Sequence, residues 1–226
     1  MKKFAIALAI LALATSAFAS TSGVVINSVY GGGGGSTTTN TYKQDYVELY
    51  NASAAPVSIA GWVIEYGSAT GNWGSSSGNY FVIPAGAVIE PCGYMLFGCG
   101  TVGTGGADFP VAADYSQSTG PNISATNGKV ALFSALNANL ACGAELAGTL
   151  VDKVSFGTGN CPEGTNVAVL SGSTGAVRTI AGIDTDSNVA DFSVVSNPVP
   201  HNKLSSTGCP VPAESQSWGA LKSTFR

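Results

Sequence analysis

The chain has 226 residues, of which 10% are charged and 45% are hydrophobic, and its formal net charge at pH 7 is −4. This acidic balance excludes the strongly basic surface that nucleic-acid binding requires. The hydrophobic content excludes a disordered chain, and the single histidine argues against a histidine-based hydrolytic metal site.

Residues 1–19 have the three parts of a secretory signal peptide. Lys2 and Lys3 precede an apolar run over residues 4–14, and Ala17-Phe18-Ala19 supplies a small-x-small cleavage pattern. The apolar run is shorter than the ~20 residues that a transmembrane helix needs, and no later segment is long enough. We therefore expect cleavage after Ala19, a protein that is secreted or held at the cell surface, and no transmembrane helix in the mature chain.

Short runs with strand-like patterns recur after residue 19, separated by loops rich in Gly, Ser and Thr. In one of them, Tyr46 and Glu48 alternate with Val47 and Leu49, which predicts a strand with one buried face. The predicted strands cover residues 24–30, 45–50, 61–66, 80–84, 93–97, 129–134, 149–156 and 191–195. Because no amphipathic helical pattern lies between them, the sequence predicts an all-β sandwich in one domain.

The C-terminal part differs in composition from the predicted strands. Residues 196–212 include four prolines and His201, which indicates an extended linker leaving the sandwich. In the tail Trp218–Arg226, three apolar residues would share one face of a helix, as in a sorting or anchoring signal, but a docked flap or a frayed terminus fits as well. The expected organisation is a signal peptide at 1–19, a sandwich domain at 20–203, and a Pro-containing linker with an amphipathic tail at 204–226.

Several ordered blocks of the sequence resemble one known family. The densest is Gln44–Tyr66, QDYVELYNASAAPVSIAGWVIEY, and VVINSVY precedes it at residues 24–30. Further blocks follow at residues 152–157, 161–164 and 184–192. Over Val24–Lys203 the chain thus resembles the lamin-tail domain family, and in particular its secreted bacterial branch. The resemblance implies an immunoglobulin-like antiparallel β-sandwich.

Export would place the five cysteines in a compartment where disulfides form and persist. We expect a bridge between Cys142 and Cys161, because the chain between them can go out as one strand and return, and because the resemblance implies cysteines at both points. Cys92 and Cys99 would lie about 23 Å apart in an extended strand, too far for a disulfide. They can pair only if the chain between them bends back, and Cys209 is an alternative partner for either.

Two glycine-containing motifs suggest enzyme chemistry, and each has a plainer explanation. Residues 98–103 fit the dinucleotide pattern G-x-G-x-x-G, but no helix-forming segment follows that could hold a pyrophosphate. Residues 74–78 fit G-x-S-x-G, but the strand and helix of a nucleophile elbow are missing around Ser76. His201, the base that such a triad would need, lies in the expected linker. We interpret both motifs as loops.

Two further residue groups could bind a ligand. Asp184, Asp186 and Asn188 resemble the opening of a calcium loop, but Val189 and Val195 replace the glycine and glutamate that such a loop requires, so Asx turns are the expected role. Aromatic side chains could also form a binding surface on the sandwich, although tyrosine is common on ordinary strands. These aromatic residues are Tyr46, Tyr50, Tyr66, Trp73 and Tyr80.

The sequence therefore predicts a non-catalytic, exported binding or structural module at or outside the cell surface, with no cofactor, no metal and no catalytic residue. We expect its partner to be an unknown protein or a component of the cell envelope, and we expect no binding to nucleic acid. The alternative is an accessory subunit of a separate secreted hydrolase, because the resemblance implies that such domains often accompany exported nucleases and phosphatases. Sandwich folds host many unrelated activities, so only a site can identify the function.

Overall fold

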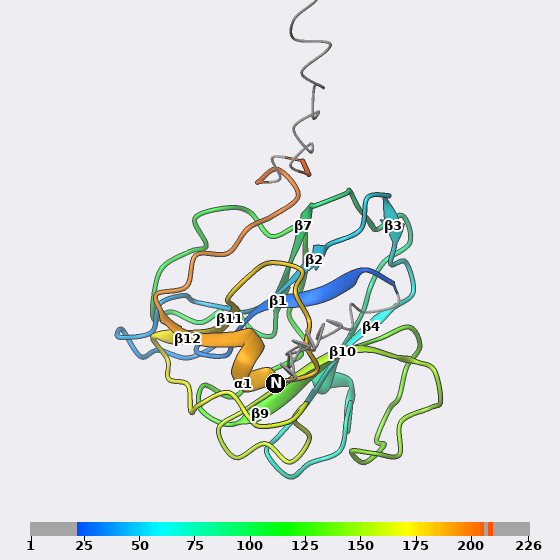
Figure 1. The fold of residues 1–226 in the computed structure, drawn as a ribbon. Coiled ribbons are helices and arrows are strands. Elements are labelled where there is room, and N and C mark those ends of the chain that lie inside the picture. Colours follow the sequence, from blue (N-terminus) through cyan, green and yellow to red (C-terminus); the bar gives the residue numbers. More distant parts are fainter. Residues whose placement is uncertain (1–21, 206–207, 210–226) are drawn as a thin grey trace, which may run out of the picture.

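Two β-sheets pack face to face in the computed structural model, which describes residues 22–205, 208 and 209 (Figure 1). The strands are β1 (Val24–Tyr30), β2 (Asp45–Asn51), β3 (Val57–Ser58), β4 (Val63–Gly67), β5 (Tyr80–Val82), β6 (Val88–Ile89), β7 (Tyr94–Cys99), β8 (Tyr115–Gln117), β9 (Gly128–Phe133), β10 (Leu150–Phe156), β11 (Thr174–Arg178) and β12 (Phe192–Ser196). A 3-10 turn, η1 (Ser77–Asn79), precedes β5, and a single-turn helix, α1 (Asn188–Asp191), precedes β12.

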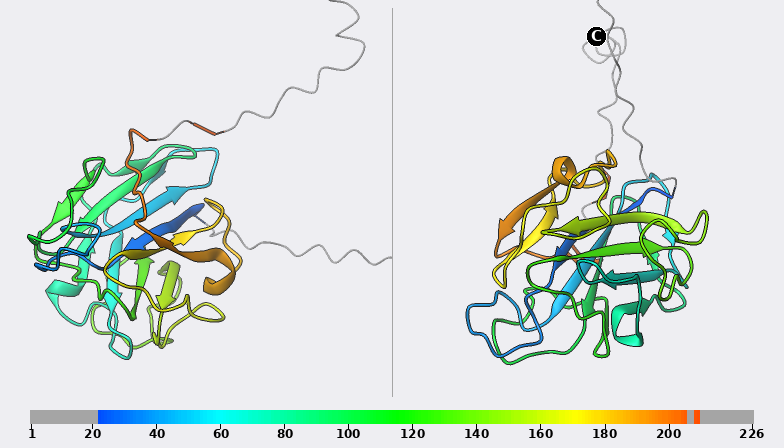
Figure 2. Two further views of the ribbon diagram at one scale, coloured as in Figure 1. Left: turned by 90° about the vertical axis from the view of Figure 1, so that its left-hand side faces the viewer. Right: turned by 90° about the horizontal axis from the view of Figure 1, so that it is seen from below.

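The larger sheet has six strands in the order β12-β11-β1-β2-β7-β8, and the smaller has four in the order β10-β9-β4-β5. Strands β3 and β6 form a separate pair. Paired strands are antiparallel except β7 and β8, which run parallel at the edge of the larger sheet. Figure 2 shows the layered arrangement from two further sides. The expected all-β, immunoglobulin-like sandwich is confirmed.

The main hydrophobic core lies between the two sheets. Ile26 of β1 and Leu49 of β2 point inward from the six-stranded sheet, and Ile64, Leu132 and Phe156 meet them from the four-stranded sheet, all at 0% exposure. These residues follow the period of two within their strands, which is why the sequence pattern located the strands correctly.

The outer face of the six-stranded sheet is also buried at the central strands β1 and β2, so the expectation of strands with one solvent-exposed face was wrong for β2. Tyr46 and Glu48 are both 0% exposed. Tyr30, Tyr42, Tyr46 and Leu96 form a second hydrophobic cluster there, against which Phe109 and neighbouring residues pack. This face is covered because long loops far apart in the sequence fold across it, which a period-two pattern cannot reveal.

Strands β3, β6, β8 and β11 were missed by the sequence analysis. The first three have only two or three residues, too few for a periodic pattern to emerge. β11 includes Gly175, which weakens a strand signal but is required here, because a Cβ at this position would lie 2.8 Å from the Val29 carbonyl oxygen and 2.9 Å from Pro198. β11 therefore completes the sheet between β1 and β12 despite its composition.

Residues 197–205, here called the strap, do not form the linker expected from their prolines. The Tyr42 hydroxyl donates to the Pro198 carbonyl at 2.9 Å, and the Asn202 side-chain amide donates to the Ala112 carbonyl at 2.8 Å. The strap therefore packs along the sandwich. The expected tail Trp218–Arg226 and the expected signal peptide lie outside the described residues.

Two disulfides join distant parts of the chain. Cys142 is bonded to Cys161, the pair expected above, and Cys92 is bonded to Cys209 across a sequence separation of 117. The fifth cysteine, Cys99, is a buried free thiol. Within residues 22–205, 208 and 209, no helix has the length and apolar character to cross a membrane.

Candidate functional site

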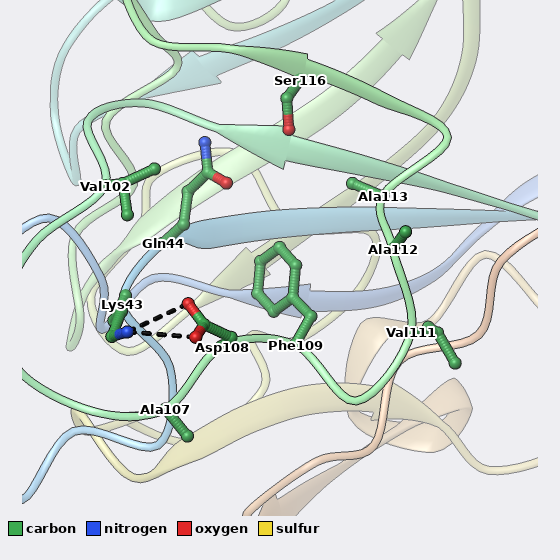
Figure 3. Close-up of a pocket in the computed structure, with 10 residues that line it drawn as sticks. All are labelled: Lys43, Gln44, Val102, Ala107, Asp108, Phe109, Val111, Ala112, Ala113 and Ser116. Carbon is green, nitrogen blue, oxygen red and sulfur yellow. Dashed lines mark hydrogen bonds and ion pairs between the residues drawn. The ribbon is translucent and has the colours of Figure 1, made fainter.

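A pocket of about 240 Å³ opens on the outer face of the six-stranded sheet, beside the edge strand β8 (Figure 3). Its walls come from the residues just before β2, the loop after β7, and the segment that leads into β8. The lining residues are Lys43, Gln44, Val102, Ala107, Asp108, Phe109, Val111, Ala112, Ala113 and Ser116. Figure 3 shows the Phe109 ring at the centre, between the Lys43–Asp108 pair and Val111–Ala113.

The polar wall is positioned by backbone contacts around Lys43 and Gln44. The Lys43 N–H donates to the Ala107 carbonyl at 2.9 Å, and the Gln44 side-chain amide donates to the Gly100 carbonyl at 2.9 Å. Gly98 is required beside them, because a Cβ there would overlap the Ser116 hydroxyl and lie 2.7 Å from Gln44 Oε1. The glycine thus lets Gln44 and Ser116 approach each other across β7.

The floor of the pocket is aromatic. The Phe109 ring packs edge-on against Tyr42 and Tyr46, with ring centroids 5.2 and 5.6 Å away. Tyr46 is held in turn by a 3.0 Å hydrogen bond between its hydroxyl and that of Ser28. Since this cluster is fully packed below Phe109, the pocket has a rigid apolar base.

The wall formed by residues 111–114 is held in place by the strap. Asn202 donates to the Ala112 carbonyl, and the Lys203 N–H donates to Asp114 Oδ2 at 3.0 Å. The same Asp114 oxygen accepts the Leu96 N–H of β7 at 2.9 Å. The strap therefore fixes one side of the pocket to the six-stranded sheet.

The charged groups of the pocket neutralise each other at its rim. Lys43 Nζ lies 3.1 Å from Asp108 Oδ1, with side chains 33% and 82% exposed, so the pair contributes little to stability. The remaining polar groups are an amide and a hydroxyl, from Gln44 and Ser116. The ten lining residues can hold a ligand by apolar contact and a few hydrogen bonds, but they supply no nucleophile paired with a base.

Two buried carboxylates with raised pKa values, Asp45 and Glu65, serve the fold rather than the pocket. Burial raises the pKa of Asp45 to about 7, against the opposing effect of the Ile123 and Gly33 N–H groups that donate to it at 2.8 and 2.7 Å. Burial likewise raises the pKa of Glu65 to about 7, while Glu65 accepts the Asn137 N–H at 2.6 Å. Both carboxylates tie loops to the sheets, and neither lines the pocket.

A family model of the Lamin Tail Domain matches residues 17–158. The chain belongs to the Lamin Tail Domain family. In this Lamin Tail Domain protein the match ends just after β10, and β11 and β12 extend the six-stranded sheet beyond it. The family suggests a non-catalytic, immunoglobulin-like module. No curated protein matches the chain.

The residues of the two enzyme-like motifs are used structurally in this Lamin Tail Domain protein. Ser76 is exposed and precedes the three-residue turn η1, not a helix. The backbone N–H and ring of His201 contact Glu48, with Nδ1 3.3 Å from Glu48 Oε2, and the ring stacks on Tyr94 at 4.7 Å. Gly103, in the G-x-G-x-x-G segment, donates to the Lys43 carbonyl at 2.7 Å.

The block Asp184–Asn188 forms an Asx turn instead of a calcium loop. The Asp186 N–H donates to Asp184 Oδ1 at 3.3 Å. Asn188 Oδ1 accepts the N–H groups of Ser155 and Glu163 at 2.9 and 3.1 Å, so that this oxygen is already occupied. Asn188 thereby ties the turn before β12 to β10.

Three of the five aromatic residues considered as a binding surface are buried, while Tyr50 and Tyr80 are half-buried. Tyr46 and Trp73 are 0% exposed and Tyr66 is 6% exposed. Phe109, the aromatic residue that does line the pocket, was not identified from the sequence. The available signal was the apolar segment FPVAA at residues 109–113, which interrupts a loop otherwise rich in glycine, serine and threonine.

Proposed function

We propose that this Lamin Tail Domain protein is an exported, non-catalytic binding module of the secreted bacterial branch of the family, and that it binds an extended segment of a partner protein beside β8. The pocket around Phe109 is the observation that carries this proposal. Its volume of about 240 Å³ is below the ≈300–1,000 Å³ typical of small-molecule sites, so it suits one apolar side chain of a larger partner.

The edge position of β8 supports an extended partner. β8 is the last strand of the six-stranded sheet, and it pairs through Phe97–Cys99 of β7 on one side only. An extended segment can add to such an edge through main-chain hydrogen bonds, while its alternate side chains enter adjacent pockets. Ser116 belongs both to β8 and to the pocket wall, so the two features can act together.

Export is supported by the two disulfides, because disulfides persist in oxidising compartments and are rare in the cytosol. Fractionation of culture medium, soluble periplasm and envelope tests it, with the N-terminus of the recovered protein determined by mass. We expect a chain beginning at Ser20 outside the cytoplasm. Comparison with a chain truncated before Ser217 tests the role of the tail, because an anchor or sorting signal predicts loss from the envelope only in the truncated protein.

The binding proposal is tested with a displayed library of random peptides selected on the purified protein. Ala112→Trp fills the pocket from its exposed wall, and Ala147→Trp adds the same side chain at an exposed position after Glu145, outside the pocket lining. We expect selected peptides to share an apolar residue and to bind the wild type and Ala147→Trp equally. Ala112→Trp should weaken binding by more than about tenfold, that is ~1.4 kcal/mol.

Peptides that bind Ala112→Trp as tightly as the wild type would contradict the pocket as the binding site. Turnover of ester, phosphate or nucleic-acid substrates by the purified protein would contradict the non-catalytic assignment. If a separate secreted nuclease or phosphatase co-purifies and is released by Ala112→Trp but not by Ala147→Trp, the partner is that enzyme and the protein is its accessory subunit.

A further inference from the structure

Three carboxylates meet at a site away from the pocket, where β10 contacts the segment leading to β12. Asp152 lies in β10, Glu163 in the loop after β10, and Asp184 in the turn before α1. One oxygen from each carboxylate lies within 4.8 Å of the others. Asp152 and Asp184 are buried, and Glu163 is partly exposed, so the group is open to solvent on the Glu163 side.

Asp152 has an oxygen that the protein itself does not use. Its side chain is 1% exposed, and Oδ2 accepts both the Ile26 N–H at 2.6 Å and an Arg178 N–H at 2.8 Å. Within the described residues Oδ1 is buried and has no hydrogen-bond partner. A buried carboxylate oxygen without a hydrogen-bond partner lowers the stability of the fold. Here the oxygen belongs to Asp152, whose neighbours include the carboxylates of Glu163 and Asp184.

The nearby cations do not neutralise these acids. Arg178 contacts Asp152 directly and lies 3.7 Å from Asp184 and 3.4 Å from Asp191, so one guanidinium is shared among three carboxylates. Its Nε and Nη1 atoms also donate to the backbone carbonyls of Ile26 and Ile183. Near Glu163, the positive charge of Lys153 is set against the negative charges of Asp152, Asp184 and Asp186. A bound cation would relieve this repulsion.

Asn188 positions Glu163 for such a role. The Asn188 amide donates to Glu163 Oε2 at 3.1 Å and to the Lys153 carbonyl at 2.9 Å, and its oxygen accepts the Glu163 N–H. The orientation of Glu163 is thus set by a fully buried side chain. A preorganised carboxylate is what a cation ligand requires.

We propose that Asp152, Glu163 and Asp184 together bind a calcium ion. The donor set consists of oxygens only, which selects a hard cation. Oxygens that bind one Ca²⁺ ion at ~2.4 Å are at most ~4.8 Å apart, and the three carboxylate oxygens lie within 4.8 Å of one another, so one ion can contact all three. Mg²⁺ needs shorter distances and a strict octahedron. The site differs from the motif Asp184–Asn188, because Asp186 and Asn188 do not belong to the donor set.

The test is calorimetric titration of the purified full-length protein with CaCl₂, together with its melting temperature in calcium, in magnesium and in EDTA. We expect a dissociation constant of about 10⁻⁴–10⁻³ M, as in extracellular calcium modules, and a melting temperature that rises in calcium more than in magnesium. Glu163→Gln should weaken calcium binding by more than about tenfold, because a charged ligand is lost.

Asp186→Asn is the matched control, because it removes the same charge from an exposed acid of the neighbouring turn. We expect it to retain the calcium affinity of the wild type. The proposal is overturned by wild-type affinity in Glu163→Gln, by an equal loss in Asp186→Asn, or by absence of binding to the folded wild type at about 10 mM calcium. The melting curve in EDTA shows that each variant is folded, so loss of binding is not confused with loss of structure.

Discussion

The guanidinium group of Arg178 is fully buried and joins three parts of the chain. It donates to the Ile26 carbonyl of β1 at 2.9 Å, to Asp152 of β10 at 2.8 Å and to the Ile183 carbonyl at 2.6 Å, and its face lies 4.5 Å from the centre of the Phe192 ring. A buried ion pair is not in itself a net gain in stability, but removing one member leaves the other uncompensated. Arg178 therefore acts as a tie between the two sheets.

Replacing Arg178 with methionine should lower the free energy of unfolding by about 3–5 kcal/mol, because Asp152 is then left charged and buried without its partner. Lys43→Met is the matched control at an exposed ion pair, for which the change should stay below about 1 kcal/mol. Urea unfolding followed by circular dichroism measures both. Similar losses in the two variants would contradict the argument from burial.

The strap, residues 197–205, holds the C-terminal end of the described chain against the sandwich. It contacts the sandwich through hydrogen bonds at Pro198, His201, Asn202 and Lys203. Beyond the strap, Cys209 is bonded to Cys92, which lies two residues before the start of β7. The disulfide closes a loop with a sequence separation of 117, and such long loops restrict the unfolded chain strongly. The disulfide thus ties the C-terminal end of the described chain to the segment that leads into β7.

Cys209→Ser should release the strap and lower the free energy of unfolding by about 2–5 kcal/mol, the usual cost of losing a native disulfide. Hydrogen exchange should accelerate at the His201 and Lys203 amides, which bond to Glu48 and Asp114. Amides in the middle of β1 and β2 should keep their protection. The double variant Cys142→Ser, Cys161→Ser is the control, and the prediction fails if strap protection is lost equally in both.

At the scale of the whole molecule, both faces of the six-stranded sheet are covered at its central strands β1 and β2, and buried carboxylates tie the covering loops to it. Asp45 at the start of β2 accepts N–H groups from Gly33 and from Ile123, two loops that are remote from each other in sequence. Asp45 is only 4% exposed, and its pKa is raised to about 7. The pairing of His201 with Glu48, opposed by partial burial, raises the pKa of His201 as well.

These shifts predict a fold that is more stable at pH 5 than at pH 8. A carboxyl group whose pKa is higher in the folded than in the unfolded state keeps its proton on folding, so its contribution is lost as pH rises through the folded pKa. For Asp45 the free energy of unfolding should fall by about 1.4 kcal/mol per pH unit between about 4 and 7. Because the pKa of His201 is also raised, its protonation likewise makes the free energy of unfolding fall as pH rises above the ordinary pKa of histidine.

Urea unfolding between pH 4 and pH 8 measures this dependence. Asp45→Asn should be less stable at low pH and should show a shallower slope, because its amide does not titrate. Asp108→Asn, at a side chain that is 82% exposed, should leave the slope unchanged. Stability that rises with pH in the wild type would contradict the prediction.

Much of the fold could be predicted from local patterns. Val24, Val47 and Ile64 belong to runs whose period of two reflects a real buried face, so the main strands and the sandwich class followed from them. The pocket could not be predicted in the same way. Phe109 acquires its role only because Tyr42 and Tyr46 pack below it and because Asn202 holds Ala112 beside it.

By itself, the sequence determined the all-β class, the main strands and the resemblance to the Lamin Tail Domain family, since these depend on residues close together in the chain. Only the tertiary structure decided that Tyr46 and Glu48 are buried, that Cys209 pairs with Cys92, and that Glu163 meets Asp152 and Asp184. Each of these involves segments that are distant in sequence. Local periodicity and spacing carry no information about which loop closes over which face, so burial and side-chain clusters emerge only when the sheets have packed.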